Sequence, residues 1–205
     1  MKYTHIAFDV DGTLINTEYA ILHSLQETMK TVSSKELPLD ELTFVLGITG
    51  KDGLKRLGVE DVDAVLDLWN KKMLDYADTM TFFNGMTELL DELLKLDCKM
   101  GIITSRTREE FDWGFDGTDI ERYFKAIVCA DDTKEHKPTA EPLLKYMELS
   151  GADRAHVLYV GDSEYDSQCA QNAGVDFALA VWGSHSQEVK AQHYLNQPAD
   201  LLELL

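Results

Sequence analysis

Short apolar runs alternate with amphipathic stretches through the second half of the chain. The runs that predict strands are residues 3–8, 99–103, 126–129, 157–160 and 177–181. Between them, apolar residues at helical spacing predict helices at 86–96, 140–149 and 164–173. Fully apolar strands that alternate with helices are typical of a parallel sheet covered on both faces. The sequence therefore predicts an α/β fold around a parallel sheet.

Residues 16–80 follow a different pattern. Helical spacing recurs at 18–32 and 61–76, with Pro38 and the loop 47–53 between these stretches and no convincing strand pattern. A helical block of this length is close to the smallest size, roughly 60 residues, at which a unit folds by itself. We expect a helical insertion within the α/β fold.

Polar side chains follow four of the five predicted strands. In chain order these residues are Asp9 and Asp11, Thr104 and Ser105, Asp131 and Asp132, and Asp162. Such residues also end strands in ordinary turns. However, the carboxyl ends of parallel strands meet at one edge of the sheet, which is where ligands bind in this fold class. Four polar ends at one edge indicate an active site.

The strongest chemical signal is the segment D-V-D-G-T at residues 9–13, directly after the first strand. One carboxylate can attack phosphorus and form an aspartyl-phosphate. A second carboxylate two residues later projects to the same side of an extended segment and can protonate the leaving oxygen. Gly12 allows a sharp turn, and the Thr13 hydroxyl can hold phosphate oxygens. The segment predicts nucleophilic phosphoryl chemistry.

The sequence resembles the haloacid dehalogenase superfamily of phosphotransferases, because all four motifs of that family occur in it in order. They are D-V-D-G-T-L at 9–14, Thr104 after an apolar strand, Lys137-Pro138, and the G-D-x-x-x-D segment at 161–166. The resemblance implies a Rossmann-like three-layer α/β/α core over residues 1–15 and 85–205. It also implies a small all-helical cap domain over residues 16–84, inserted after the first strand with hinges near 15–17 and 81–84.

The resemblance also implies roles for the acids. Asp9 would be the nucleophile and a magnesium ligand, and Asp11 the general acid/base, with its backbone carbonyl on the metal. Asp162 would be the remaining protein ligand, and a shell made only of oxygen suits Mg²⁺. Asp166 would support the metal site or orient a coordinated water.

Further residues follow from the same resemblance. Thr104 and the amide of Ser105 would bind a phosphoryl oxygen, and Lys137 would neutralise Asp9 and the transferred group. Lys51 in loop 47–53 and Arg106 after the second motif are candidate specificity residues. Each also has a plainer interpretation, as a lysine of an ordinary loop and as an arginine bound to a nearby carboxylate.

Composition restricts the partners. With 37 Asp+Glu against 19 Lys+Arg the formal net charge is −18, which argues against nucleic acid and anionic membranes. No apolar run approaches the length of a membrane span. The first apolar run ends at Asp9 and is too short for a signal peptide. Three cysteines, Cys98, Cys129 and Cys169, match no disulfide or zinc pattern. We expect a soluble cytoplasmic protein that binds a small phosphorylated metabolite.

Within the resembled family, Asp11 argues against dehalogenases and transporting ATPases. Thr104-Ser105-Arg106, Gly161-Asp162 and Trp182-Gly183 are similar to phosphoglycolate phosphatase-like members and favour a phosphatase. A β-phosphoglucomutase-like phosphomutase stays an alternative, although those enzymes usually carry Glu-Asp at the position of Gly161-Asp162. A catalytically silent binding module is a third interpretation, but it would normally lack the nucleophile. The substrate and the oligomeric state are left open.

Two further expectations follow. The tryptophans, Trp69, Trp113 and Trp182, are too scattered to predict a common stacking surface. Asp9, Asp11, Asp162 and Asp166 would repel an anionic substrate until magnesium and Lys137 are in place. We therefore expect phosphate to bind weakly without a divalent metal.

Overall fold

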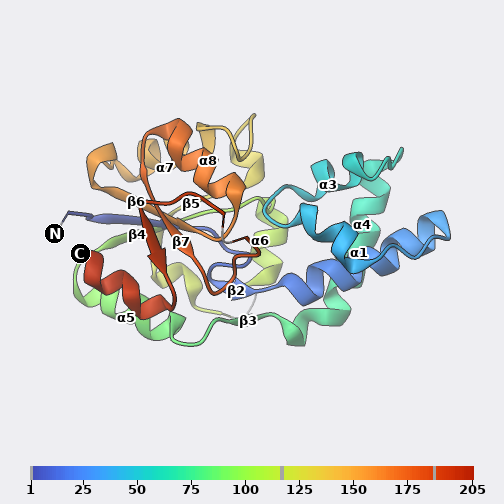
Figure 1. Ribbon diagram of the computed structural model, residues 1–205, viewed down its shortest axis with the longest axis horizontal. Helices are drawn as coiled ribbons and strands as arrows, with labels where there is room; N and C mark the ends of the chain where they lie inside the picture. The colour runs from blue at the N-terminus through green and yellow to red at the C-terminus, as the bar shows by residue number, and fades with distance from the viewer. Residues whose placement is uncertain (1, 116–117, 187) are drawn as a thin grey trace.

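A computed structural model describes residues 2–115, 118–186 and 188–205 (Figure 1). Its main element is a six-stranded parallel sheet in the order β5-β4-β1-β6-β7-β8. The strands are β1 (His5–Phe8), β4 (Lys99–Ile103), β5 (Phe124–Val128), β6 (Val157–Gly161), β7 (Asp176–Ala180) and β8 (His193–Leu195). The predicted α/β fold with a parallel sheet is confirmed.

Helices cover both faces of this sheet. The helices of this part are α5 (Met86–Lys95), α6 (Arg108–Gly114), α7 (Glu141–Ser150) and α8 (Glu164–Ala173), and the 3₁₀ segments are η3 (Ile120–Arg122), η4 (Ala130–Asp132), η5 (Arg154–His156) and η6 (Pro198–Leu204). Alternate residues of β1 enter different layers, because side chains alternate along a strand. Ile6 and Phe8 pack with α5 and η6, whereas Ala7 packs with α7 and α8. The result is three layers (Figure 1).

Residues between β1 and α5 form a separate helical group. It contains α1 (Glu18–Ser33), α2 (Leu39–Leu42), η1 (Thr43–Val45), α3 (Gly50–Arg56), α4 (Val62–Met73) and η2 (Leu74–Thr79). These helices pack on one another through their own buried residues, including Leu25, Leu54 and Trp69. In Figure 1 they extend to one side of the sheet. In the described part of the chain no helix is both long and apolar enough to cross a membrane.

Three elements differ from the sequence prediction. The strand β8 was not predicted, because its three residues H-Y-L form no apolar run. Helix α6 was also missed, although Thr107 and Glu110 form a capping box, a sequence signal for a helix start. The segments expected to be hinges pair as a short antiparallel ribbon of β2 (Ile15–Asn16) and β3 (Thr81–Phe82). The two segments through which the chain enters and leaves the helical group therefore lie side by side.

Strand order places the candidate residues. The strand β1 lies between β4 and β6, and Phe8 is in register with Ile102 on one side and Val160 on the other. The residues that follow these three strands therefore meet at one edge. This edge is the expected position for a ligand in an open parallel sheet.

Candidate active site

Lys137 joins two buried carboxylates at the carboxyl edge of the sheet. Its Nζ lies 2.7 Å from Oδ1 of Asp9 and 2.8 Å from Oδ1 of Asp166. The lysine side chain is only 2% exposed, and both carboxylates are equally inaccessible. A buried charge needs a partner at this distance. Lys137 of the third motif therefore pairs with Asp9 of the first motif and Asp166 of the fourth.

This group carries more negative than positive charge. Carboxylate oxygens of Asp9, Asp162 and Asp166 lie within 4.8 Å of one another. Burial raises the pKa of Asp9 to about 7, against the opposing charge of Lys137. Burial and the neighbouring acids also raise the pKa of Asp162 well above its usual value. Three carboxylates around one lysine have the oxygen chemistry and the excess charge that suit a hard divalent cation such as Mg²⁺.

Asp166 is held on both of its oxygens. Its Oδ1 accepts from Lys137 and, at 2.7 Å, from the Tyr159 hydroxyl. Its Oδ2 accepts from the backbone N–H of Ser163 at 3.1 Å and from the Ser163 hydroxyl. A Cβ at Gly161 would lie 2.6 Å from this carboxylate, so glycine is needed there. With its oxygens occupied by protein donors, Asp166 is arranged to support the site.

Asp11 is held by Arg106. The Nε and Nη2 atoms of Arg106 donate to the two carboxylate oxygens of Asp11 at 2.9 and 2.7 Å. Burial alone would raise the pKa of Asp11, but the charge and hydrogen bonds of Arg106, together with smaller contributions from Thr17 and Lys137, hold it below its usual value. Gly114 leaves room for the guanidinium, since a Cβ there would lie 2.1 Å from Arg106 Nη1. The structure thus gives Arg106 the plainer of its two interpretations.

Glycine residues let two loops approach Asp162. Gly12 has φ +80, and a Cβ there would lie 2.4 Å from Asp162 Oδ2. A Cβ at Gly183 would lie 1.7 Å from the Gly12 carbonyl oxygen. The buried Thr13 hydroxyl donates to Asp162 Oδ1 at 3.2 Å. Thr13 therefore orients a carboxylate here, and its predicted contact with phosphate stays a prediction.

The second motif follows β4. Thr104 is buried, and its hydroxyl oxygen accepts from the Arg106 N–H at 3.2 Å. Its own hydroxyl proton remains for another acceptor, as phosphate binding would require. The Ser105 hydroxyl donates to the Gly47 carbonyl oxygen at 2.9 Å. Ser105 thereby connects the sheet edge to the loop between η1 and α3.

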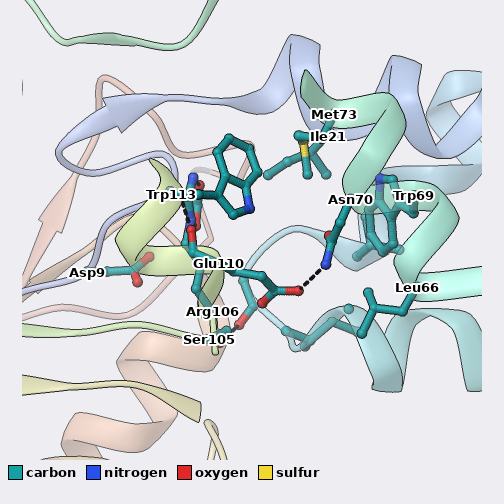
Figure 2. Close-up of a pocket in the computed structure, with 15 residues that line it drawn as sticks. Asp9, Ile21, Leu66, Trp69, Asn70, Met73, Ser105, Arg106, Glu110 and Trp113 are labelled. Carbon is teal, nitrogen blue, oxygen red and sulfur yellow. Dashed lines mark hydrogen bonds and ion pairs between the residues drawn. The ribbon is translucent and has the colours of Figure 1, made fainter. Parts of the chain in front are cut away.

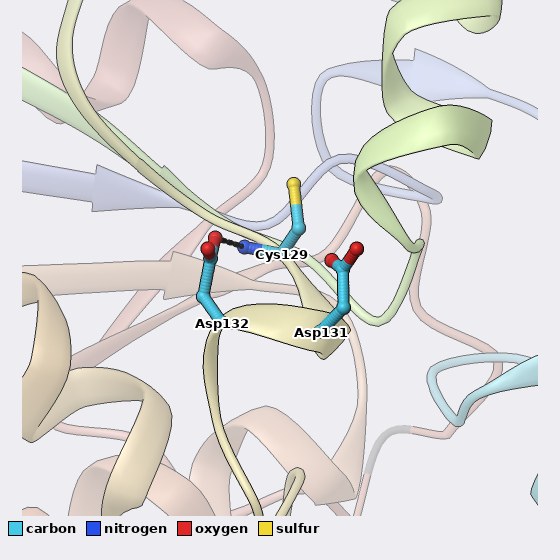
Figure 3. A group of neighbouring side chains, drawn as sticks. All are labelled: Cys129, Asp131 and Asp132. Atoms are coloured by element: carbon cyan, nitrogen blue, oxygen red, sulfur yellow. Dashed lines mark hydrogen bonds between the residues drawn. The ribbon is translucent and has the colours of Figure 1, made fainter.

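Two of the strand-end acids do not belong to this site (Figure 3). Asp131 accepts from the Arg108 N–H at 2.9 Å, and Asp132 accepts from the Cys129 N–H at 2.8 Å. The guanidinium of Arg108 also pairs with Asp132 at 3.1 Å. Burial raises the pKa of Cys129 to about 12, so its thiol is protonated at neutral pH in the metal-free protein. The carboxyl end of β5 lies at the same edge as the other strand ends, as predicted, but its two acids make local contacts and do not join the group of Asp9, Asp162 and Asp166.

Lys51 lies apart from these groups. Its Nζ forms an ion pair of 2.6 Å with Asp63, and about half of its side chain is exposed, 51%. It does not line the cavity next to Asp9 and Asp11. It lines a neighbouring cavity instead, which shares Ser105 and Glu110 with the first, and its role in specificity stays a prediction.

A cavity lies between the sheet edge and the helical group, as Figure 2 shows. Its lining on the sheet side includes Asp9, Asp11, Arg106 and Glu110, and on the helical side Leu66, Trp69, Asn70 and Met73. Trp69 and Trp113 both line it, a common position that their spacing in the sequence does not reveal. Glu110 was also missed, although the capping box at Thr107 is the signal that could have placed it on a helix next to the second motif.

The sequence matches the haloacid dehalogenase-like hydrolases over residues 6–180. The chain belongs to this family. It is 29% identical over 210 residues to the pyrophosphatase PpaX of Bacillus cereus (strain AH820), covering 100% of this chain and 97% of that protein. A solved structure from Lactobacillus plantarum, provisionally named a phosphoglycolate phosphatase, matches with a TM-score of 0.91 and 30% identity over all of both chains. CbbY from Rhodobacter sphaeroides, solved with phosphate, has a TM-score of 0.83 at 18% identity over 97% and 96% of the chains.

The match spans the described sheet from β1 to β7 and the helical group between β1 and α5. The resemblance inferred from the four motifs is therefore confirmed. At 18% identity the likeness to CbbY shows the fold alone. The two relatives near 30% identity have roughly the length of this chain and bear the names of enzymes that release phosphate.

Proposed function

We propose that this member of the haloacid dehalogenase-like hydrolases is a magnesium-dependent phosphatase, which hydrolyses a small phosphomonoester through an aspartyl-phosphate on Asp9. The observation that carries the proposal is the buried Lys137 ammonium, bonded to Asp9 and Asp166, with Asp162 in the same group and Asp11 two residues away. The names of the two relatives near 30% identity support phosphate release as the reaction class.

In the first half-reaction, an oxygen of Asp9 bonds to phosphorus and the bond from phosphorus to the leaving oxygen breaks. Lys137 stabilises the charge on Asp9 and on the transferred group, and the Thr104 hydroxyl donates a hydrogen bond to a phosphoryl oxygen. Asp11 gives a proton to the leaving oxygen, which requires that substrate binding weaken its pair with Arg106. In the second half-reaction Asp11 takes a proton from water, which attacks phosphorus and frees Asp9. The ionised form of Asp11 that Arg106 favours suits this second step.

Mg²⁺ would be held by the carboxylates of Asp9 and Asp162 and by the backbone carbonyl of Asp11. Asp166 supports this group through Lys137 and Ser163 without an oxygen to spare. The ion supplies positive charge that brings the phosphoryl group next to Asp9. The excess of buried carboxylates is the observation that fits such an ion.

We further propose that residues 16–84 act as a cap domain on a core of residues 1–15 and 85–205. Several polar contacts cross between these parts, and three of them lie well away from the segments through which the chain enters and leaves the helical group. These three are Ser105 Oγ to Gly47 O at 2.9 Å, Asn70 Nδ2 to Glu110 Oε1 at 3.0 Å, and Arg56 Nη1 to the Tyr165 hydroxyl at 2.9 Å. A cap held in this position keeps bulk water away from the transferred group.

The Gly161-Asp162 form favours hydrolysis over the phosphomutase alternative, because it is similar to the phosphoglycolate phosphatase-like members. A glutamate there, as in β-phosphoglucomutase-like proteins, would place its Cβ 2.6 Å from Asp166. The side chain of Asp166 would then have to shift. The arrangement observed here is specific to glycine at this position.

The proposal is tested with p-nitrophenyl phosphate and Mg²⁺. We expect phosphate release that EDTA stops and added Mg²⁺ restores, and that Asp9→Asn abolishes. In parallel, β-glucose 1-phosphate tests for isomerisation. Hydrolysis that survives in Asp9→Asn would contradict the aspartyl-phosphate, and clean isomerisation would favour the phosphomutase.

A further inference from the structure

The position of the leaving group follows from Asp11. Under the proposed function Asp11 protonates the leaving oxygen, so the leaving group must occupy a space that Asp11 lines and that the helical residues cover. The cavity in Figure 2 meets both conditions. A second cavity also touches Asp11 and residues of the helical group such as Leu46, but Asp162 and Gly12 line it as well, and these belong to the proposed metal side.

The helical wall of the first cavity carries no charge in the described part of the chain. The residues that form it are Ile21, Val45, Gly47, Ile48, Gly50, Leu66, Trp69, Asn70 and Met73. The Trp69 indole is fixed, since its Nε1 donates to Ser24 Oγ at 2.9 Å. The wall is therefore an apolar surface of defined shape with one amide, the side chain of Asn70.

The sheet side of the cavity offers no free cation among the described lining residues. Three acids, Asp9, Asp11 and Glu110, face one base, Arg106, so the lining sums to −2. Both hydrogen bonds of the Arg106 fork go to Asp11. Glu110 accepts from Asn70 and, at 2.8 Å, from the Thr107 N–H. The nearby Lys51 is outside the cavity and paired with Asp63.

We propose that the leaving alcohol of the substrate carries a neutral, largely apolar group that fills this cavity, in place of a second anionic group. This inference rests on the proposed phosphatase activity. An apolar group gains by leaving water for the wall, whereas a carboxylate or second phosphate would lose its hydration and have to compete with Asp11 for Arg106. Pyrophosphate and phosphoglycolate both place an anion next to the transferred phosphate, so the chain differs here from the activities in its relatives' names.

The test compares two esters that differ by one carboxylate, benzyl phosphate and 4-carboxybenzyl phosphate, each with Mg²⁺. We expect kcat/KM to be at least about tenfold higher for benzyl phosphate. Phosphoglycolate and pyrophosphate should be as poor as the carboxylated ester. Binding of the two esters to Asp9→Asn, measured by calorimetry, should show the same order without turnover.

A cation added to the wall should remove this preference. Met73 lines the cavity and has about the length of lysine, so Met73→Lys should lower the ratio of the two kcat/KM values by at least about fivefold. Met73→Leu is the matched neutral control and should retain the wild-type ratio. Ile48→Lys, on the loop before α3, provides a second cation position if Met73→Lys does not fold by circular dichroism.

The outcomes separate the two proposals. Equal kcat/KM values, or a preference for the carboxylated ester, would overturn the apolar leaving group and leave the phosphatase intact. A ratio unmoved in both folded lysine variants would also overturn it. If none of the four phosphate compounds and no p-nitrophenyl phosphate is hydrolysed with Mg²⁺, the proposed function fails and the inference fails with it.

Discussion

The two walls of the central cavity differ in chemistry and in origin. The sheet wall carries paired charges, with Lys137 on Asp9 and Arg106 on Asp11, at the ends of adjacent strands. The helical wall is uncharged and is built from α1, the loop before α3, and α4. The sheet wall is suited to one reaction on any phosphoryl group, whereas the helical wall is suited to select what that group is attached to.

The difference also predicts how each wall responds to substitution. A buried ion pair that loses one partner leaves an uncompensated charge, so changes in the sheet wall should damage both the reaction and the fold. An apolar wall tolerates exchange of side chains of similar volume, so changes there should alter preference more than rate.

The largest effect is expected for Asp9→Asn. An amide oxygen is a poor nucleophile, so kcat should fall by about a thousandfold or more for every ester. Phosphate release is measured with Mg²⁺, and circular dichroism checks the fold. Asp131→Asn is the matched control, because Asp131 also follows a strand but bonds to the Arg108 N–H. A similar loss of kcat in the control would contradict the role of Asp9 as the nucleophile.

Lys137→Met should be next. Without the ammonium, Asp9 and Asp166 are buried with no counter-charge, so the free energy of unfolding should fall by about 3 kcal/mol and kcat/KM by about a hundredfold. Urea unfolding is measured with and without Mg²⁺, which should recover part of the loss. Lys134→Met, an exposed lysine three residues earlier, should change neither quantity. Stability unaffected by Lys137→Met would contradict the buried bridge.

Arg106→Met should have an intermediate effect. It distinguishes a positioning role of Arg106 from a role in substrate specificity. If Arg106 positions Asp11, kcat should fall by about ten- to a hundredfold and equally for benzyl and 4-carboxybenzyl phosphate. Both esters are assayed side by side with Mg²⁺. A loss confined to the carboxylated ester would instead make Arg106 a specificity residue that binds the anionic group.

Lys51→Ala should have the smallest effect. Its ion pair with Asp63 is exposed, and such pairs contribute little. The KM values for benzyl phosphate and phosphoglycolate should change by less than about twofold, measured from initial rates. A larger rise in KM for phosphoglycolate alone would show that Lys51 turns into the site and pairs with the carboxylate.

The sequence predicted the sheet wall far better than the helical wall, for a physical reason. Asp9, Asp11, Asp162 and Asp166 belong to short segments whose backbone spacing fixes their direction, and apolar strands show where those segments end. The direction of a helical residue depends instead on how several helices pack. Spacing alone could therefore not bring Trp69 and Trp113 to one cavity, or show that Lys51 lies outside it.

Local hydrogen bonds account for the other differences. Asp131 and Asp132 look like site residues in the sequence, but backbone N–H groups and Arg108 occupy them. Whether a strand-end acid serves a turn or a site depends on these partners. The three-residue β8 is held by its pairing with β7, which no pattern within His193–Leu195 reveals.

The most direct test of the proposed chemistry is to trap the phosphoryl group during the first turnover. The protein with Mg²⁺ is mixed with benzyl phosphate, quenched in acid within one turnover, digested and analysed by mass spectrometry. We predict a phosphorylated peptide that contains Asp9 and is missing in Asp9→Asn. Rapid release of phosphate with no covalent phosphoryl group, or a phosphoryl group on another peptide, would contradict it.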